Sequence, residues 1–154
     1  MKINTSSPIQ TKKIAAKLAK EILKSKPHKK HARVIALVGD LGAGKTTFVQ
    51  GFAKALGIKQ RMVSPTFLIF RSYEISGIGS KQKVVRYKKF YHVDTYRVHS
   101  PKELNVLDFK SLLLTTNAIL LIEWADQIKK ILPKDTIWVH FTHGRKETER
   151  IITY

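Results

Sequence analysis

Apolar residues in the N-terminal part of the chain recur first at helical spacing and then without interruption. Ile14, Leu18 and Ile22 stand four residues apart, which predicts a helix from about residue 8 to residue 23. Residues 34–38 form an unbroken apolar run, which is typical of a strand covered on both faces. A buried strand at the centre of a sheet is therefore expected after the first helix.

A second helix is predicted in the middle of the chain. Phe48, Phe52 and Leu56 share one helical face, which predicts a helix over residues 46–56. Gly57 follows at the position where helices commonly end. An antiparallel hairpin is then predicted from two strand patterns, over residues 67–73 and 83–93.

The C-terminal part of the chain continues the alternation of helices and strands. Ser100 and Glu103 have the spacing of a capping box, which predicts a helix from Ser100 to about Leu114. The remaining predicted elements are a buried strand over residues 118–122, a helix over residues 124–132 and a hairpin of residues 137–141 with 150–154. Helices interleaved with buried strands imply a three-layer α/β fold, with a central mostly parallel sheet and antiparallel additions.

Composition limits the class of protein. The chain has 154 residues, of which 43% are hydrophobic and 26% charged, so one folded domain over residues 1–154 is expected. The absence of cysteine excludes disulfide scaffolds, thiolate zinc sites and a cysteine nucleophile. The apolar run at residues 118–122 is too short to span a membrane, and the first residues lack the apolar stretch of a secretion signal. A cytoplasmic protein without membrane contact is expected.

Charge adds a candidate partner. Lys and Arg number 29 against 11 Asp and Glu, which gives a formal net charge of +18 and predicts attraction to nucleic acid or an acidic partner. Two regions are densely basic: Lys12, Lys13, Lys17, Lys20, Lys24, Lys26, Lys29, Lys30 and Arg33, and then Lys81, Lys83, Arg86, Lys88 and Lys89. Both a solvated surface and direct contact with nucleic acid fit these regions. The helical face has no aromatic residue to stack on bases, which argues against sequence readout.

The strongest motif is a phosphate-binding loop between the first buried strand and the second helix. Residues 39–46 read Gly-Asp-Leu-Gly-Ala-Gly-Lys-Thr, which matches the Walker A spacing in its required strand-to-helix context. Glycines let backbone N–H groups surround phosphate oxygens, and Lys45 supplies a positive charge to the β- and γ-phosphates. The Thr46 hydroxyl is expected to bind Mg²⁺. The fold is therefore expected to be of the P-loop NTPase type.

Phosphoryl transfer also requires an acid near the metal ion, and two residues compete for that role. Glu123 follows the apolar run at residues 118–122, and Asp94 follows the strand pattern that ends at Val93. A solvated carboxylate at a strand end is the alternative for each. Trp124 comes directly after Glu123, and its spacing alone favours a place in the core.

Four motifs, taken together in their order and separation, resemble the bacterial TsaE family over essentially the whole chain. They are Gly39-Asp40-Leu41-Gly42-Ala43-Gly44-Lys45-Thr46-Thr47, Ser64-Pro65-Thr66-Phe67, His92-Val93-Asp94-Thr95-Tyr96-Arg97 and Ile122-Glu123-Trp124. The resemblance implies a small ATPase that uses ATP and Mg²⁺ to make threonylcarbamoyladenosine in tRNAs reading codons that begin with adenine. It also implies action with the TsaD–TsaB complex, in which TsaD transfers the threonylcarbamoyl group.

The resemblance also implies roles for single residues. Lys45 and Thr46 hold phosphates and Mg²⁺, Glu123 lies at the metal, and Asp94 supports the metal or the attacking water. Thr66 resembles the nucleotide-sensing residue of the family, and Trp124 becomes a functional candidate. Candidate nucleotide-binding residues are Asp40, Leu41, Gly42, Ala43, Gly44, Lys45, Thr46, Thr47, Thr66 and Trp124. The chain departs from the family in having Ala125-Asp126 after the tryptophan and a long basic segment at residues 76–83.

Other functions that the sequence leaves open are a small-molecule kinase and a nucleic-acid-binding module regulated by nucleotide. A kinase usually carries a mobile arginine-bearing lid, for which residues 145–150 are a poor candidate. A GTPase is disfavoured because the chain has no Asn-Lys-x-Asp guanine-binding motif. The pairs His28 with His31 and His140 with His143 have metal-ligand spacing but lack acidic or cysteine companions in the sequence, so they are interpreted as surface histidines.

Overall fold

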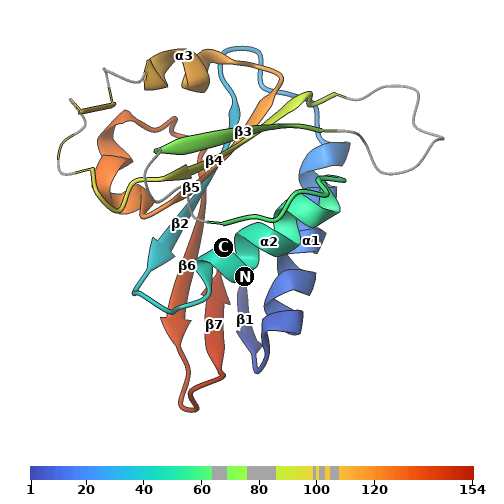
Figure 1. Ribbon diagram of the computed structural model, residues 1–154, viewed down its shortest axis with the longest axis vertical. Coiled ribbons are helices and arrows are strands. Elements are labelled where there is room, and N and C mark those ends of the chain that lie inside the picture. Colours follow the sequence, from blue (N-terminus) through green and yellow to red (C-terminus); the bar gives the residue numbers. More distant parts are fainter. Residues whose placement is uncertain (64–68, 76–85, 99, 101–102, 105–107) are drawn as a thin grey trace.

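A single mixed sheet organises the protein (Figure 1). The computed structural model describes residues 1–63, 69–75, 86–98, 100, 103–104 and 108–154. Its 7-stranded sheet has the order β1-β7-β6-β2-β5-β4-β3. The strands are β1 Lys2–Thr5, β2 Arg33–Gly39, β3 Phe70–Glu74, β4 Lys89–Asp94, β5 Ala118–Glu123, β6 Ile137–His143 and β7 Arg150–Thr153. The helices are α1 Pro8–Lys24, α2 Lys45–Ala55, α3 Phe109–Leu114 and the 3₁₀ helix η2 Ala125–Ile131.

The central strands are parallel and the outer ones antiparallel, as the sequence predicts. β2 pairs in parallel with β5 and β6, and β4 pairs in parallel with β5. β3 joins β4, β7 joins β6 and β1 joins β7 in antiparallel pairs. Parallel neighbours end at the same edge of a sheet, so the segments that follow β2, β4 and β5 meet there.

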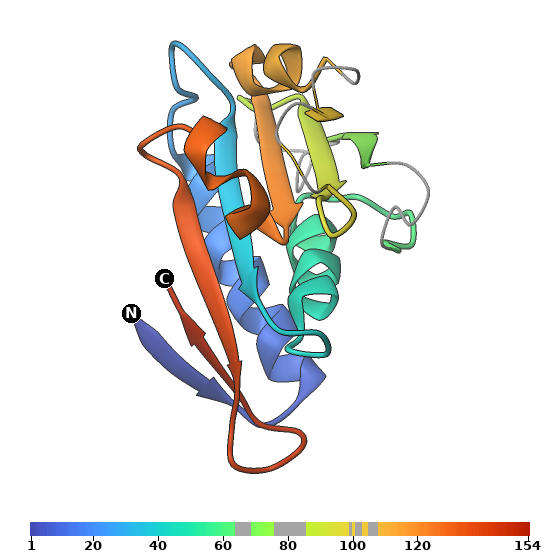
Figure 2. The same ribbon diagram turned by 90° about the vertical axis from the view of Figure 1, so that its left-hand side faces the viewer.

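Helices cover both faces of the sheet, which makes the three layers (Figure 2). α1 and α2 pack on one face through a cluster that includes Leu18, Phe48 and Phe52. On the other face, α3 and η2 contribute Phe109 and Ile128 to a second cluster. Side chains alternate along each strand, so β5 sends successive residues into opposite clusters and is buried over its whole length.

The ends of the first two helices follow from local sequence. The Ser7 side chain accepts a hydrogen bond from the Gln10 backbone N–H and caps α1, with Pro8 in the first turn. Beyond α2, Gly57 has a φ of +83°, and the Ile58 N–H donates to the Ala53 carbonyl. That left-handed residue ends the helix, as expected for glycine.

Two predicted helices differ from the structure, and one strand was not predicted. The continuous helix from Ser100 to Leu114 is wrong, because Glu103 and Leu104 form a short 3₁₀ turn and α3 begins only after Asp108, whose φ is +49°. The helix predicted over residues 124–132 is a 3₁₀ helix, with non-helical backbone at Ile128. Strand β1 is not predicted, because its four residues are too few to show an alternating pattern. Its backbone pairing with β7 stabilises it.

The predicted hairpin has shorter strands than expected. β3 and β4 pair antiparallel, with Tyr73 opposite Phe90, but β4 begins at Lys89 rather than near residue 83. The segment of residues 76–85 lies outside the described residues, as do residues 64–68. Among the helices that the structure describes, none has the length and apolar character needed to cross a membrane.

Candidate functional site

Backbone geometry shapes the loop between β2 and α2. Gly39, Gly42 and Gly44 all have positive φ values, of +150°, +73° and +99°, which side chains rarely tolerate. A Cβ on Gly39 would lie 2.4 Å from the Phe141 carbonyl oxygen, so glycine is also required by packing. Gly44 is the N-cap of α2 and offers no side-chain hydrogen bond, which leaves the first N–H groups of the helix to a bound anion.

The ammonium group of Lys45 is buried at the centre of this loop. Its Nζ donates to the carbonyl oxygens of Gly39 at 2.6 Å and Asp40 at 2.9 Å, and it lies 3.7 Å from the centroid of the Trp124 ring. Burial lowers the pKa of Lys45 below its usual 10.5, and the nearby carboxylates, Glu123 first among them, oppose that shift. These short contacts hold the ammonium group where it can bind a phosphate.

A chain of hydrogen bonds runs beneath the loop. The Thr46 hydroxyl donates to Oε2 of Glu123 at 3.0 Å, and Nε2 of His92 lies 2.8 Å from Oε1 of the same carboxylate. His92 and Glu123 are almost completely buried. A carboxylate with hydrogen bonds at both oxygens is fixed in orientation.

Strand register brings the acidic residues together. Asp94 lies directly opposite Glu123 at the ends of β4 and β5, and His92 lies opposite Leu121. Alternating positions share a face, so His92, Asp94 and Glu123 point to the side that α2 covers. Oδ1 of Asp94 accepts the backbone N–H of Tyr96 at 3.0 Å, which orients this side chain at the strand end.

Trp124 adopts an unusual backbone conformation that Thr95 holds in place. Its φ is +59°, a left-handed value that costs a non-glycine residue on the order of 1 kcal/mol. The buried Thr95 hydroxyl lies 2.8 Å from the Trp124 carbonyl oxygen and 3.0 Å from that of Glu123. The indole packs against Lys45 and the Tyr96 ring, at a centroid distance of 4.9 Å from the latter. Trp124 is therefore a half-buried cover of the loop rather than a core residue.

Most of the residues singled out in the sequence meet at one place. Lys45, Thr46, Asp94, Glu123 and Trp124 come together at the ends of β4 and β5 and the start of α2. The other phosphate-loop candidates, Asp40, Leu41, Gly42, Ala43, Gly44 and Thr47, flank Lys45 and Thr46 in the same loop and helix start. Thr66 lies outside the described residues.

Sequence reasoning gave no role to four residues that contact this site. His92 and Thr95 hold Glu123 and Trp124, as described above. From the hairpin of β6 and β7, Arg150 donates to the Gly42 carbonyl oxygen from Nε at 3.2 Å and from Nη2 at 3.0 Å. His143 contacts the Leu41 carbonyl oxygen at 3.3 Å. A polar residue inside the apolar strand pattern of residues 90–93 was a usable signal for His92, whereas no local pattern marks Arg150 or His143.

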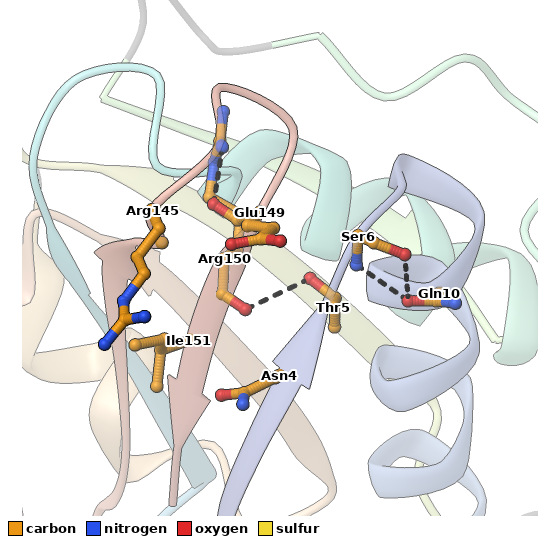
Figure 3. A pocket seen from close by; sticks show the side chains of 9 residues that line it. Asn4, Thr5, Ser6, Gln10, Arg145, Glu149, Arg150 and Ile151 are labelled. Carbon is orange, nitrogen blue, oxygen red and sulfur yellow. Dashed lines mark hydrogen bonds between the residues drawn. The ribbon is translucent and has the colours of Figure 1, made fainter.

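A separate pocket of about 580 Å³ lies between β1, the start of α1 and β7 (Figure 3). Its lining residues are Asn4, Thr5, Ser6, Gln10, Gly144, Arg145, Glu149, Arg150 and Ile151. Within it, Thr5 bonds the Arg150 carbonyl oxygen at 3.5 Å, and Gln10 accepts from the Ser6 backbone at 2.7 Å. Arg150 is the one lining residue that also touches the phosphate loop through a hydrogen bond shown above.

Comparison with known proteins gives the same family that the four sequence motifs resemble. A family model described as threonylcarbamoyl adenosine biosynthesis protein TsaE covers residues 5–152. The tRNA threonylcarbamoyladenosine biosynthesis protein TsaE of Haemophilus influenzae is 35% identical over 118 residues, which cover 77% of this chain and 68% of the relative. The protein of the same name in Bacillus subtilis is 34% identical over 154 residues, or 100% of this chain and 84% of the relative.

A solved structure agrees with these relatives. The crystal structure of Bacillus subtilis YdiB superposes with a TM-score of 0.72 at 32% sequence identity, and the match covers 99% of this chain and 82% of that one. The likeness therefore includes the sheet, the phosphate loop and the C-terminal hairpin, because almost no part of the chain is left out. By its sequence and by its fold, the chain belongs to the TsaE family.

Proposed function

We propose that the chain binds ATP with Mg²⁺ and hydrolyses it in the cytoplasm during formation of threonylcarbamoyladenosine on tRNAs that read codons beginning with adenine. One observation carries the proposal. The Thr46 hydroxyl at the start of α2 contacts the Glu123 carboxylate at the end of β5, 3.0 Å away, beside a buried Lys45. This pairs the phosphate-binding half of the site with its acidic half.

The oxygen atoms of the site fit Mg²⁺. Hydroxyl and carboxylate oxygens are the ligands that this ion prefers, and Thr46, Glu123 and Asp94 supply them side by side. Bound there, Mg²⁺ would neutralise charge that develops on the phosphates during transfer. Lys45 would turn its ammonium group from the loop carbonyls to the β- and γ-phosphates, and Asp94 would orient the attacking water.

Two buried residues hold the acidic half of the site in position. His92 fixes one oxygen of Glu123, so that the other faces Thr46. Thr95 fixes the peptide between Glu123 and Trp124, so that the indole stays over Lys45. His92 and Thr95 are positioning residues in this proposal, because each acts through another side chain.

The proposal is tested by measuring hydrolysis of ATP and of GTP by the purified chain, alone and with TsaD and TsaB. We expect ATP to be the better substrate and the partners to increase turnover. Rapid phosphorylation of a metabolite would support a small-molecule kinase instead. Against a kinase lid stands the Arg150 side chain, which donates to the carbonyl oxygens of Gly42 and Glu149.

Partner binding is proposed for the rim of the site. Leu41 in the phosphate loop is 79% exposed, and Tyr96, which packs on Trp124, is 57% exposed. Exposed apolar side chains beside a catalytic site are typical contact points for a protein partner. The TsaD–TsaB complex is the partner that family membership favours.

Substitution of His92 tests its positioning role. We expect His92→Leu to lower ATP hydrolysis at least about tenfold and to weaken the effect of Mg²⁺ on ATP affinity, because Glu123 loses one of its two fixed contacts. His92→Gln, whose side-chain amide N–H can reach Oε1, should restore most of both properties. Fluorescence titration of ATP with and without Mg²⁺ and a phosphate-release assay measure them.

The two variants separate positioning from folding. Both replace a fully buried ring, so the Tm of each variant is measured beside its hydrolysis, and a purely structural role would make hydrolysis fall only where the Tm falls. Equal hydrolysis by His92→Leu and the wild type would contradict the positioning role while leaving the proposed ATPase intact.

A second proposal concerns direct binding of tRNA by α1. Lys13, Lys17, Lys20 and Lys24 are all exposed, at the three- and four-residue spacing that places them on one face. Replacing these four lysines by glutamine should weaken tRNA binding and reduce its salt dependence, because each phosphate contact releases counterions. ATP affinity should not change.

A matched variant controls for the loss of charge. Lys59, Lys110, Lys130 and Lys134 are also exposed but lie outside α1, and their replacement by glutamine removes the same charge. Labelled tRNA titrated at several salt concentrations compares the three proteins. If both variants lose affinity equally, the attraction is a property of net charge and α1 is not the binding face.

A further inference from the structure

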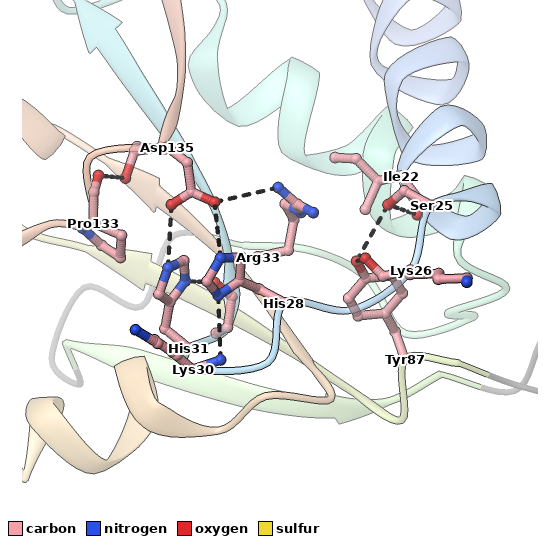
Figure 4. Close-up of polar contacts among 12 residues, drawn as sticks. Ile22, Ser25, Lys26, His28, Lys30, His31, Arg33, Tyr87, Pro133 and Asp135 are labelled. Atoms are coloured by element: carbon pink, nitrogen blue, oxygen red, sulfur yellow. Dashed lines mark hydrogen bonds and ion pairs between the residues drawn. The ribbon is translucent and has the colours of Figure 1, made fainter.

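Two histidines and one carboxylate gather at the edge of the sheet opposite the phosphate loop (Figure 4). His28 and His31 stand between α1 and β2, and Asp135 precedes β6. β2 and β6 are parallel neighbours with Ile35 opposite Ile137, so the segments that precede them meet. The phosphate loop leaves the far end of the 7-residue β2, roughly 20 Å away at about 3.3 Å per residue.

The geometry supplies what the sequence lacked, which is an acidic companion for this histidine pair. One nitrogen from each ring and one oxygen of Asp135 lie within 4.8 Å of one another. Nε2 of His31 is 3.2 Å from Oδ1 of Asp135, and the two rings stack with centroids 3.8 Å apart. Zinc with four ligands at about 2.1 Å holds them roughly 3.4 Å apart, so small rotations of the two half-buried histidines and the exposed Asp135 side chain complete the approach.

The second nitrogen of His31 decides which atom faces the carboxylate. Nδ1 lies 2.9 Å from the carbonyl oxygen of Ala32, and because a carbonyl only accepts, Nδ1 carries the proton. Nε2 then faces Oδ1 of Asp135. A backbone carbonyl on the other ring nitrogen is also the arrangement that orients metal-binding histidines.

Arg33 contacts the other oxygen of the same carboxylate. Its Nη1 is 3.6 Å from Oδ2 of Asp135, which leaves Oδ1 to face His31. Carboxylates that bind metals are commonly held by such an outer contact. The positive charges of Arg33 and of Lys29 and Lys30 reduce the affinity for any cation. Because two of the three ligand atoms are nitrogens, a metal that prefers nitrogen is favoured over Mg²⁺, which prefers oxygen.

We propose that His28, His31 and Asp135 form a Zn²⁺ site that ties the loop between α1 and β2 to the segment before β6. Water would complete the four ligands. His28 binds through Nε2 and gives up the hydrogen bond that its Nδ1 accepts from the Lys30 backbone at 3.2 Å. The proposal does not depend on ATP hydrolysis, because the site lies at the other end of β2.

Calorimetric titration of the full chain with ZnCl₂, on protein without a polyhistidine tag, tests the site. We expect one Zn²⁺ per chain with micromolar affinity, and a loss of at least about tenfold in His28→Ala, His31→Ala and Asp135→Asn. His140→Ala removes an exposed histidine of β6 and should bind as the wild type does. Zn²⁺ should also raise the Tm of the wild type and of His140→Ala, but not that of His31→Ala.

Two results would overturn the site. One is a wild type that binds no Zn²⁺, which would leave the contact of His31 with Asp135 as an ion pair alone. The other is unchanged affinity in all three cluster variants, which would place the metal elsewhere. Circular dichroism tests whether each variant is folded, and a parallel titration with MgCl₂ should give no difference between the wild type and His31→Ala.

Discussion

Lys45→Ala is expected to weaken ATP binding at least about 100-fold, which corresponds to about 2.7 kcal/mol. The ammonium group is held under the Trp124 ring with its hydrogen bonds directed at two loop carbonyls. It can exchange those acceptors for phosphate oxygens, and charge-assisted hydrogen bonds of this kind are the strong ones. Fluorescence of Trp124, which covers the ammonium group, offers a direct readout of nucleotide titrations in the wild type.

The variant should stay folded. Burial lowers the pKa of Lys45, so between that lowered value and 10.5 the unfolded chain binds the extra proton and stability rises with pH. Below this window the buried charge brings no net stability, and the Tm of Lys45→Ala should stay within about 3 °C of the wild type there.

Lys54→Ala is the matched control, since it removes an exposed lysine from the last turn of the same helix. Isothermal titration with ATP compares the three proteins. Nucleotide affinity that survives in a folded Lys45→Ala protein would remove the phosphate loop from the binding site.

Sequence periodicity predicts the inner part of this fold better than its edges. The runs that became β2 and β5 are buried on both faces, so every residue in them is apolar and the pattern is plain. β1 contains four residues at the sheet edge and depends on β7 for its hydrogen bonds. The capping-box spacing predicts one continuous helix, but the left-handed Asp108 interrupts it and α3 begins only after that residue. Where tertiary contacts decide the backbone, local patterns do not suffice.

In the candidate site too, local motifs are predictable from the sequence and contacts between distant residues are not. The Walker A loop is predictable because its glycines and Lys45 are adjacent in sequence and their chemistry is local. His92 and Glu123 meet only because β4 and β5 are parallel neighbours, a pairing of residues 31 positions apart that no spacing rule contains. Asp135 reaches His31 in the same manner, through the pairing of β2 and β6.

Glu123→Gln is expected to lower Mg²⁺-dependent ATP hydrolysis at least about 100-fold, with little loss of ATP affinity in the absence of the metal. Glutamine keeps the shape of the side chain. Its oxygen can accept from His92 and its N–H can donate to the Thr46 hydroxyl, so both contacts of the carboxylate survive. Only the negative charge is removed, and any lost hydrolysis then reports on chemistry rather than on folding.

Asp126→Asn provides the matched control for this loss of charge. Asp126 is an exposed acid three residues after Glu123, in the first turn of η2, and its replacement should leave hydrolysis within about twofold. Asp94→Asn should follow Glu123→Gln, because Asp94 lies opposite Glu123 in the register of β4 and β5. Phosphate release at saturating ATP, measured across a range of Mg²⁺ concentrations, compares all four proteins. If Glu123→Gln turns over as fast as Asp126→Asn, the acid that serves the metal is Asp94, and the hydrogen bond from Thr46 to Glu123 only stabilises the start of α2.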